Sequence, residues 1–127
     1  PKDIHQQEVD VFAPCALSNP LNIKNISQLK AKIVAGGANN QLESEQIGDA
    51  LFQSGIVYAP DYVANAGGLI SVADEYENKN TDTRRIERRV AKIKNRVSEI
   101  LKKSKSRKRA SNFVANEMAE KIFNAYK

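Results

Sequence analysis

Asparagines, glycines and other small residues follow the short apolar runs of this chain, where they can bind a small polar ligand. Asn39 comes after Gly36-Gly37 at the end of one run. Asn65 precedes Gly67-Gly68 after another run, and Ala13-Pro14-Cys15-Ala16 follows a third. An asparagine amide offers a donor and an acceptor together, which suits an amide, a ribose or a zwitterion. The glycines allow the backbone to approach a flat ligand closely.

Alternating strand and helix patterns indicate how these residues are positioned. Strands are predicted at Val9–Ala13, Lys32–Ala35 and Ile56–Ala59, helices at Glu45–Ser54 (followed by Gly55) and Ala66–Tyr76, and a helical turn at Ile26–Leu29. Such alternation is typical of a parallel sheet with crossover helices. All strands of a parallel sheet end at the same edge, so the three junctions share one rim. In open α/β sheets this rim is where small ligands bind.

The last third of the chain is predicted to form two amphipathic helices. Apolar residues recur at steps of four and three in the first, namely Ile86, Val90, Ile93, Val97 and Ile100. The second contains Phe113, Val114, Met118, Ile122, Phe123 and Tyr126. We expect the intervening segment, Lys102–Arg109, to be a polar, basic link.

Charge is distributed unevenly along the chain. The 127 residues carry a net charge of +5. Five basic and 11 acidic residues precede Arg84, and 15 basic and four acidic residues follow from Arg84 onward. A basic tail leaves open a nucleic-acid-binding or anion-binding module. Against nucleic acid, the helix has an apolar seam that must be buried, and no aromatic residues for base stacking lie among its cations.

Few residues are available for other kinds of site. No apolar run approaches the length of a membrane span. One Cys and one His do not make a zinc site, and the lone Cys15, predicted to be a small buried thiol, fits a reducing cytoplasm. Asp61 and Asp74 are predicted to form turns or cap helices. The sequence therefore contains no predicted catalytic residue and no predicted metal ligand.

Four segments in order resemble the carboxyl-terminal part of an amino acid dehydrogenase of the Glu/Leu/Phe/Val family, and within it the leucine dehydrogenases. They are Asp10–Leu17, Gln28–Gly36, Ala38–Leu42 and Gly55–Glu75. The resemblance implies an α/β fold: the carboxyl-terminal half of a Rossmann-like parallel sheet, followed by amphipathic helices. Residues 1–80 would be the distal half of the dinucleotide-binding domain, and residues 81–127 a carboxyl-terminal helical segment packing on it.

The resemblance also implies an activity and a role for each residue of the rim. The family catalyses reversible oxidative deamination of an L-amino acid to a 2-oxo acid and ammonium, with NAD as the expected cofactor. The nicotinamide end of the cofactor would be bound by Ala13, Pro14, Cys15 and Asn39. Asn65 would hold the polar head of the amino acid, and Leu69 and Val72 would line its side-chain pocket. This apolar pair suits a branched aliphatic substrate better than glutamate, whose distal carboxylate would be unpaired.

The same resemblance places essential parts of the enzyme outside this chain. The catalytic lysine and aspartate belong to an amino-terminal domain, and the glycine-rich turn and the acidic ribose-binding residue belong to the first half of the cofactor domain. We therefore expect a fragment of a homo-oligomeric cytoplasmic enzyme. The missing residues also select the amino acid and distinguish NAD from NADP. Two alternatives stay open: a basic nucleic-acid-binding or anion-binding module, and a noncatalytic scaffold that keeps the dehydrogenase fold.

The 127-residue chain by itself is expected to lack dehydrogenase activity, because the acid–base pair and the pyrophosphate-binding turn lie elsewhere. The measurement is NADH formation in the presence of NAD and L-leucine, with heat-denatured chain as the control. Leucine-dependent NADH formation above that control would contradict this prediction.

Overall fold

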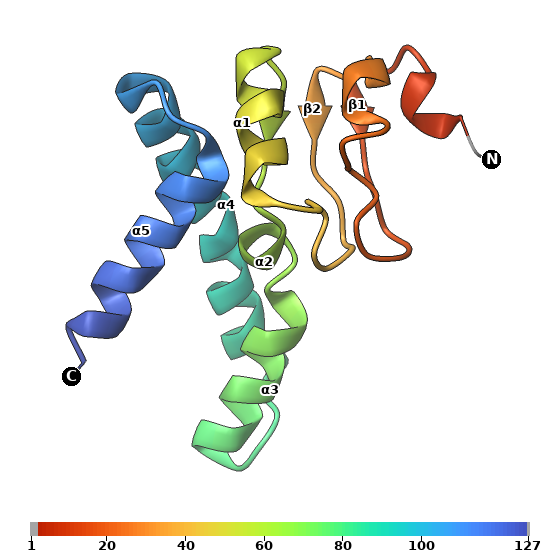
Figure 1. Ribbon diagram of the computed structural model, residues 1–127. Coiled ribbons are helices and arrows are strands. Elements are labelled where there is room, and N and C mark those ends of the chain that lie inside the picture. Colours follow the sequence, from red (N-terminus) through yellow and green to blue (C-terminus); the bar gives the residue numbers. More distant parts are fainter. Residues whose placement is uncertain (1–2, 127) are drawn as a thin grey trace.

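A three-stranded parallel sheet in the order β1-β2-β3 forms the amino-terminal part of the computed structural model, which describes residues 3–126 (Figure 1). The strands are Val11–Phe12, Ile33–Val34 and Val57–Tyr58, and they confirm the predicted parallel sheet with shorter bounds. The other elements are η1 (Ile4–Gln6), η2 (Ile26–Gln28), α1 (Glu45–Gln53), α2 (Asp61–Ala64), α3 (Gly67–Asn78), α4 (Thr83–Arg107) and α5 (Ser111–Asn124). The predicted α/β fold class is confirmed.

One face of the sheet is buried and the other is open. Side chains alternate across a strand, and the row formed by Phe12, Val34 and Tyr58 faces the core. Both crossovers return on this face, where α1 packs on the sheet (Figure 1). The core there consists of Leu21, Leu29, Ala31, Val34, Ile47, Leu51 and Tyr58.

The opposite row of the sheet is exposed. Val11, Ile33 and Val57 lie in register across the strands, and their exposed fractions are 49%, 38% and 42%. Three neighbouring apolar side chains on the surface are typical of a face that another segment covers.

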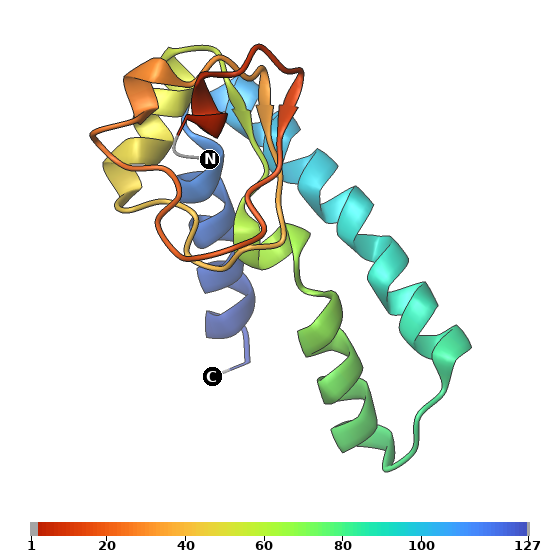
Figure 2. The same cartoon turned by 90° about the vertical axis from the view of Figure 1, so that its right-hand side faces the viewer.

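The helix predicted at residues 66–76 is present with slightly different bounds, and a short helix precedes it. The segment after Pro60 forms α2, a four-residue helix that the sequence patterns did not predict, and α3 starts at Gly67. Figure 2 shows α3 and the amino-terminal half of α4 as a hairpin that extends away from the sheet. Gly55 has a φ of 73°, so it ends α1 in the left-handed conformation as predicted.

The basic link predicted at Lys102–Arg109 was wrong, because α4 continues through Arg107. This run contains no glycine or proline, and lysine and arginine are good helix formers. Glu99 and Lys103, one turn apart, also form an ion pair with 2.7 Å between Oε1 and Nζ, and this pair stabilises the helix. The chain turns only at Lys108, whose φ is 50°, and Ser104 Oγ donates a 2.6 Å hydrogen bond to the Arg109 carbonyl.

Helices α4 and α5 pack around a second, smaller core. Ile100, Val114 and Ala115 are buried there, with Val63 and Met118 at the margin. The other four apolar residues predicted to line one side of α4 are half-buried. The predicted amphipathic helix is therefore confirmed, although most of its apolar side is only partly covered. The Ser111 hydroxyl donates a 2.7 Å hydrogen bond to the Tyr58 carbonyl and joins α5 to β3. None of the helices in residues 3–126 combines the length and apolar character needed to cross a membrane.

Asp74 has a structural role that differs from the predicted turn or cap. Its side chain is fully buried in α3 and faces two arginines of α4. Arg85 Nε lies 2.9 and 2.8 Å from the two carboxylate oxygens, and Arg89 Nη1 lies 3.0 Å from one of them. The hydrogen bonds from Arg85 and Arg89 hold the pKa of Asp74 below its ordinary value. The ion pairs of Asp74 with Arg85 and Arg89 hold α3 against α4 in the hairpin.

Asp74→Asn is expected to destabilise the fold at neutral pH, with a difference from the wild type that shrinks on acidification. The folded-state pKa lies below the ordinary value of 3.8, so ionised Asp74 stabilises the fold above that pH. The contribution is lost as the pH falls from 3.8 through the depressed folded-state value. Urea unfolding across this range measures it, with the exposed neighbour Glu75→Gln as the control. A difference of equal size at neutral pH and at about pH 3 would contradict this assignment.

Candidate functional site

The ends of β1 and β2 are joined by backbone contacts at the predicted rim. Ala38 N–H donates to the Pro14 carbonyl at 2.9 Å, and Gly37 N–H donates to Cys15 Sγ at 3.3 Å. Gly36 lies so close to Pro14 that a Cβ atom would come within 2.2 Å of the Pro14 oxygen. Only glycine fits this position, so it fixes the distance between the two loops.

Asn39 and Asn65, from two different junctions, are hydrogen-bonded to each other. Asn65 Nδ2 donates to Asn39 Oδ1 at 2.8 Å and lies 3.4 Å from the carbonyls of Gly37 and Ala38. Within residues 3–126, Asn39 Nδ2 and Asn65 Oδ1 have no hydrogen-bond partner. The amide pair therefore offers one donor and one acceptor to a ligand.

A buried glutamine, which the sequence patterns did not single out, holds this loop in place. Gln41 is fully buried, and its Nε2 donates to the carbonyls of Gly36 and Ala38 at 2.8 and 2.9 Å. Its backbone N–H donates to Asp61 Oδ2 at 2.8 Å, which connects the β2 loop to α2. A fully buried amide in a loop is rare enough to indicate a structural role, but the sequence alone does not reveal its burial.

Asp61 organises the start of α2. Its second oxygen accepts the backbone N–H of Tyr62 at 2.7 Å, in agreement with the predicted turn-forming role. Its own N–H donates to the Tyr58 hydroxyl at 3.2 Å. Burial, together with the nearby Asp61 carboxylate, raises the pKa of Tyr58, so this phenol stays neutral at physiological pH and is no base.

The small residues after β1 lie along the same rim. Pro14 is buried, whereas Ala13 and Cys15 are exposed. The prediction of a buried thiol at Cys15 was wrong. The loop after β1 runs over the surface, where the Cys15 sulfur accepts the Gly37 amide instead of packing into the core.

Leu69 and Val72 are on the surface of α3, one and two turns after Asn65. Their exposed fractions are 74% and 65%, so neither side chain lies in the core. Residues three apart on a helix project to the same side. They form a small apolar surface that is available to a ligand. Within residues 3–126 there is no cluster of histidine, cysteine and carboxylate residues that could hold a metal ion.

The model of the Glutamate/Leucine/Phenylalanine/Valine dehydrogenase family matches residues 1–125. The chain belongs to this family. The resemblance predicted from its motifs is thereby confirmed.

Individual relatives include dehydrogenases with different names. Leucine dehydrogenase of Bacillus cereus is 45% identical over 120 residues, which are 94% of this chain and 32% of that protein. Phenylalanine dehydrogenase of Bacillus thermotolerans is 43% identical over 122 residues, 96% of this chain and 31% of that protein. The chain thus spans about a third of the length of these dehydrogenases.

The fold is shared with a solved member of the family. The crystal structure of L-tryptophan dehydrogenase from Nostoc punctiforme is similar with a TM-score of 0.90 and 41% sequence identity. The match covers 97% of this chain and 37% of that one. The sheet and the helices of this chain are therefore arranged as in the matching part of that dehydrogenase.

Gln41→Met is expected to lower the free energy of unfolding by about 1–2 kcal/mol, because two carbonyls lose a buried donor. The Gln41 oxygen has no hydrogen-bond partner within residues 3–126, so the loss comes from the two donated bonds. Urea unfolding measures the change, and the exposed Gln46→Met in α1 is the matched control. Equal stability of the two variants would contradict the role of Gln41.

Proposed function

We propose that this chain is the part of an NAD-dependent amino acid dehydrogenase that binds the nicotinamide end of the cofactor and one side of the substrate. The reaction is reversible oxidative deamination. An L-amino acid, water and oxidised cofactor give a 2-oxo acid, ammonium, reduced cofactor and a proton. The observation that carries the proposal is the Asn39–Asn65 pair, which places a donor and an acceptor that are free within residues 3–126 at the carboxyl ends of parallel strands.

The rim suits a nicotinamide ribose. Asn39 Nδ2 is free to donate to the carboxamide, and Ala13, Pro14 and Cys15 supply a surface of small side chains. At Gly37 a Cβ atom would meet only the Cys15 sulfur, at 3.7 Å, so the backbone is open to close approach. When bound, the cofactor supplies the hydride acceptor of the reaction.

The substrate lies beside Asn65, whose free Oδ1 accepts a hydrogen bond from the ammonium group of the amino acid. Leu69 and Val72 then contact its side chain. An aliphatic side chain buries apolar area against this pair, whereas the distal carboxylate of glutamate would lose its hydration without gaining a partner. A branched-chain amino acid is therefore the proposed substrate class.

The whole enzyme contains more than this chain. Residues 1–80 are the distal half of the cofactor domain and residues 81–127 a helical segment that packs on it. An amino-terminal domain supplies the catalytic residues, and the active form is a cytoplasmic homo-oligomer. The exposed row of Val11, Ile33 and Val57 supports a covering segment, because an apolar sheet face of this kind is normally buried.

A chimera tests this proposal. The chain replaces the matching segment of Bacillus cereus leucine dehydrogenase, with which it shares 45% identity. The chimera is expected to reduce NAD with L-leucine, L-valine and L-isoleucine, and much less with L-phenylalanine, L-tryptophan or L-glutamate. Asn65→Ala is expected to raise KM for the amino acid by about tenfold, since the ammonium loses a charge-assisted hydrogen bond.

The exposed Ile122→Ala, in α5, is the control for substitution and should leave KM unchanged. A folded chimera without activity, judged by circular dichroism, would refute the proposed function. A preference for glutamate or for an aromatic amino acid would refute the substrate class alone.

A further inference from the structure

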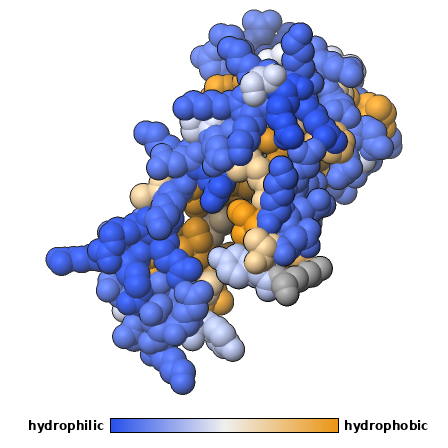
Figure 3. All heavy atoms as spheres, turned by 90° about the vertical axis from the view of Figure 1, so that its left-hand side faces the viewer, coloured by the Kyte–Doolittle hydropathy of each residue, from blue (hydrophilic) through white to orange (hydrophobic). Residues whose placement is uncertain are grey.

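A groove separate from the rim runs between α4 and the α2–α3 segment. Its volume is about 560 Å³, which is typical of small-molecule sites, and it is open to solvent along one side. Its floor is apolar, formed by Val63, Ala66, Ile70 and Ile93. The face of the molecule drawn in Figure 3 is hollowed, with hydrophobic residues inside the hollow and hydrophilic residues around it.

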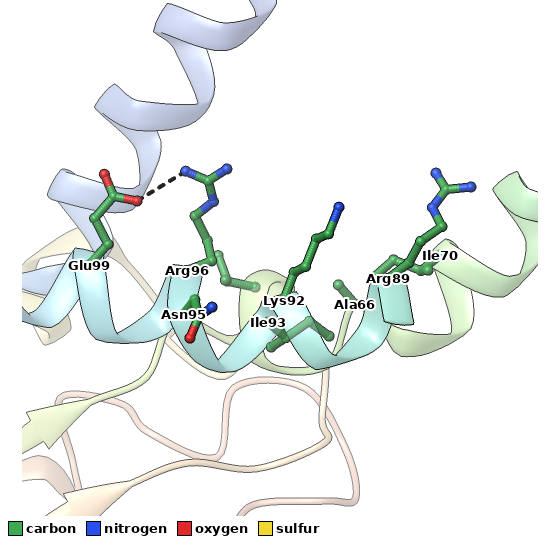
Figure 4. Close-up of a pocket in the computed structure, with 9 residues that line it drawn as sticks. Ala66, Ile70, Arg89, Lys92, Ile93, Asn95, Arg96 and Glu99 are labelled. Carbon is green, nitrogen blue, oxygen red and sulfur yellow. Dashed lines mark hydrogen bonds and ion pairs between the residues drawn. The ribbon is translucent and has the colours of Figure 1, made fainter. Parts of the chain in front are cut away.

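Cations line one wall of this groove. Arg89, Lys92 and Arg96 recur on α4 at steps of three and four, so they project from the same side of the helix, as Figure 4 shows. Glu99 is the one carboxylate among the lining residues. The groove therefore combines an apolar floor with a positively charged wall.

The ion pairs around the groove leave part of this charge unbalanced. Arg89 is paired with Asp74 and Glu77, at 3.0 and 2.9 Å. Arg96 shares Glu99 with Lys103, at 3.2 and 2.7 Å.

Lys92 has no ion-pair partner within residues 3–126, and Arg96 has only a shared one. Lys92 and Arg96 are four residues apart on α4 and their side chains point to the same side of the helix (Figure 4), so one anionic group can contact both.

We propose that this groove binds a small organic anion with an apolar body. The head group, a carboxylate or a phosphate, lies against Lys92 and Arg96, and the hydrocarbon part lies on Ala66, Ile70 and Ile93. A polyanion such as nucleic acid would gain nothing from the apolar floor, whereas a neutral apolar molecule would gain nothing from the cations.

This site is distinct from the amino acid rim. None of its lining residues belongs to the set proposed to bind cofactor or substrate. Ala66 and Ile70 face α4, whereas Leu69 and Val72 project from another side of α3. The inference therefore does not depend on the proposed dehydrogenase function.

Titration calorimetry on the 127-residue chain tests the proposal, with octanoate, octyl phosphate and 1-octanol as probes. We expect saturable binding of the anions that weakens as salt is added, and binding of 1-octanol at least tenfold weaker, about the effect of losing two ion pairs. The tighter of the two anions identifies the preferred head group. Amide chemical shifts of Ala66, Ile70 and Ile93 should change on binding.

Charge-matched variants separate the site from general electrostatics. Lys92→Gln/Arg96→Gln is expected to weaken anion binding by about tenfold. Lys94→Gln/Lys105→Gln removes two exposed charges on the opposite side of α4 and should change binding by less than about twofold. Circular dichroism checks that each variant is folded. Ile70→Ala leaves all charges in place and should weaken binding because it removes apolar contact with the hydrocarbon part of the ligand.

Three binding results would overturn the proposal. They are the absence of saturable binding, equal binding of octanoate, octyl phosphate and 1-octanol, and equal weakening by the two double variants. Chemical-shift changes centred on Asn39 and Asn65 would also overturn it, because they would place the anion at the rim.

Discussion

The hydrogen bonds that Gln41 donates from the core hold the candidate site in its geometry. They fix the carbonyls of Gly36 and Ala38, and the second of these also lies beside the Asn65 amide. The backbone of Gln41 reaches Asp61, so the same residue joins the β2 loop to the start of α2. This buried amide is hard to replace, because an apolar side chain would leave the Gly36 carbonyl without a donor within residues 3–126 and the Ala38 carbonyl with only the longer contact to Asn65. The rim therefore depends on a residue that no ligand needs to touch.

The sheet is covered on one face and exposed on the other. Val34 and Tyr58 are buried under α1, while Ile33 and Val57, their neighbours along the strands, remain exposed. The similarity to L-tryptophan dehydrogenase covers 97% of this chain but 37% of that structure. What the chain contains is thus a coherent layer of the family fold.

Part of the positive charge of the last third has a structural role that composition alone does not reveal. Arg85 and Arg89 pair with the buried Asp74, and Arg107 and Arg109 pair with Glu117 in α5. These cations join α4 to α3 at one end and to α5 at the other. The remaining unpaired charge lies partly along the groove beside Lys92, next to apolar side chains.

The order of strands and helices, the shared rim and the family could be predicted from the sequence, because periodicity, turn residues and motifs are local properties of the chain. The sequence also placed Asn39 and Asn65 on one edge, since parallel strands end together. The exposure of Cys15 and the burial of Asp74 and Gln41 became clear only in the folded chain. These features depend on contacts between segments far apart in the chain. A buried carboxylate or amide is stable only where such contacts supply its hydrogen-bond partners.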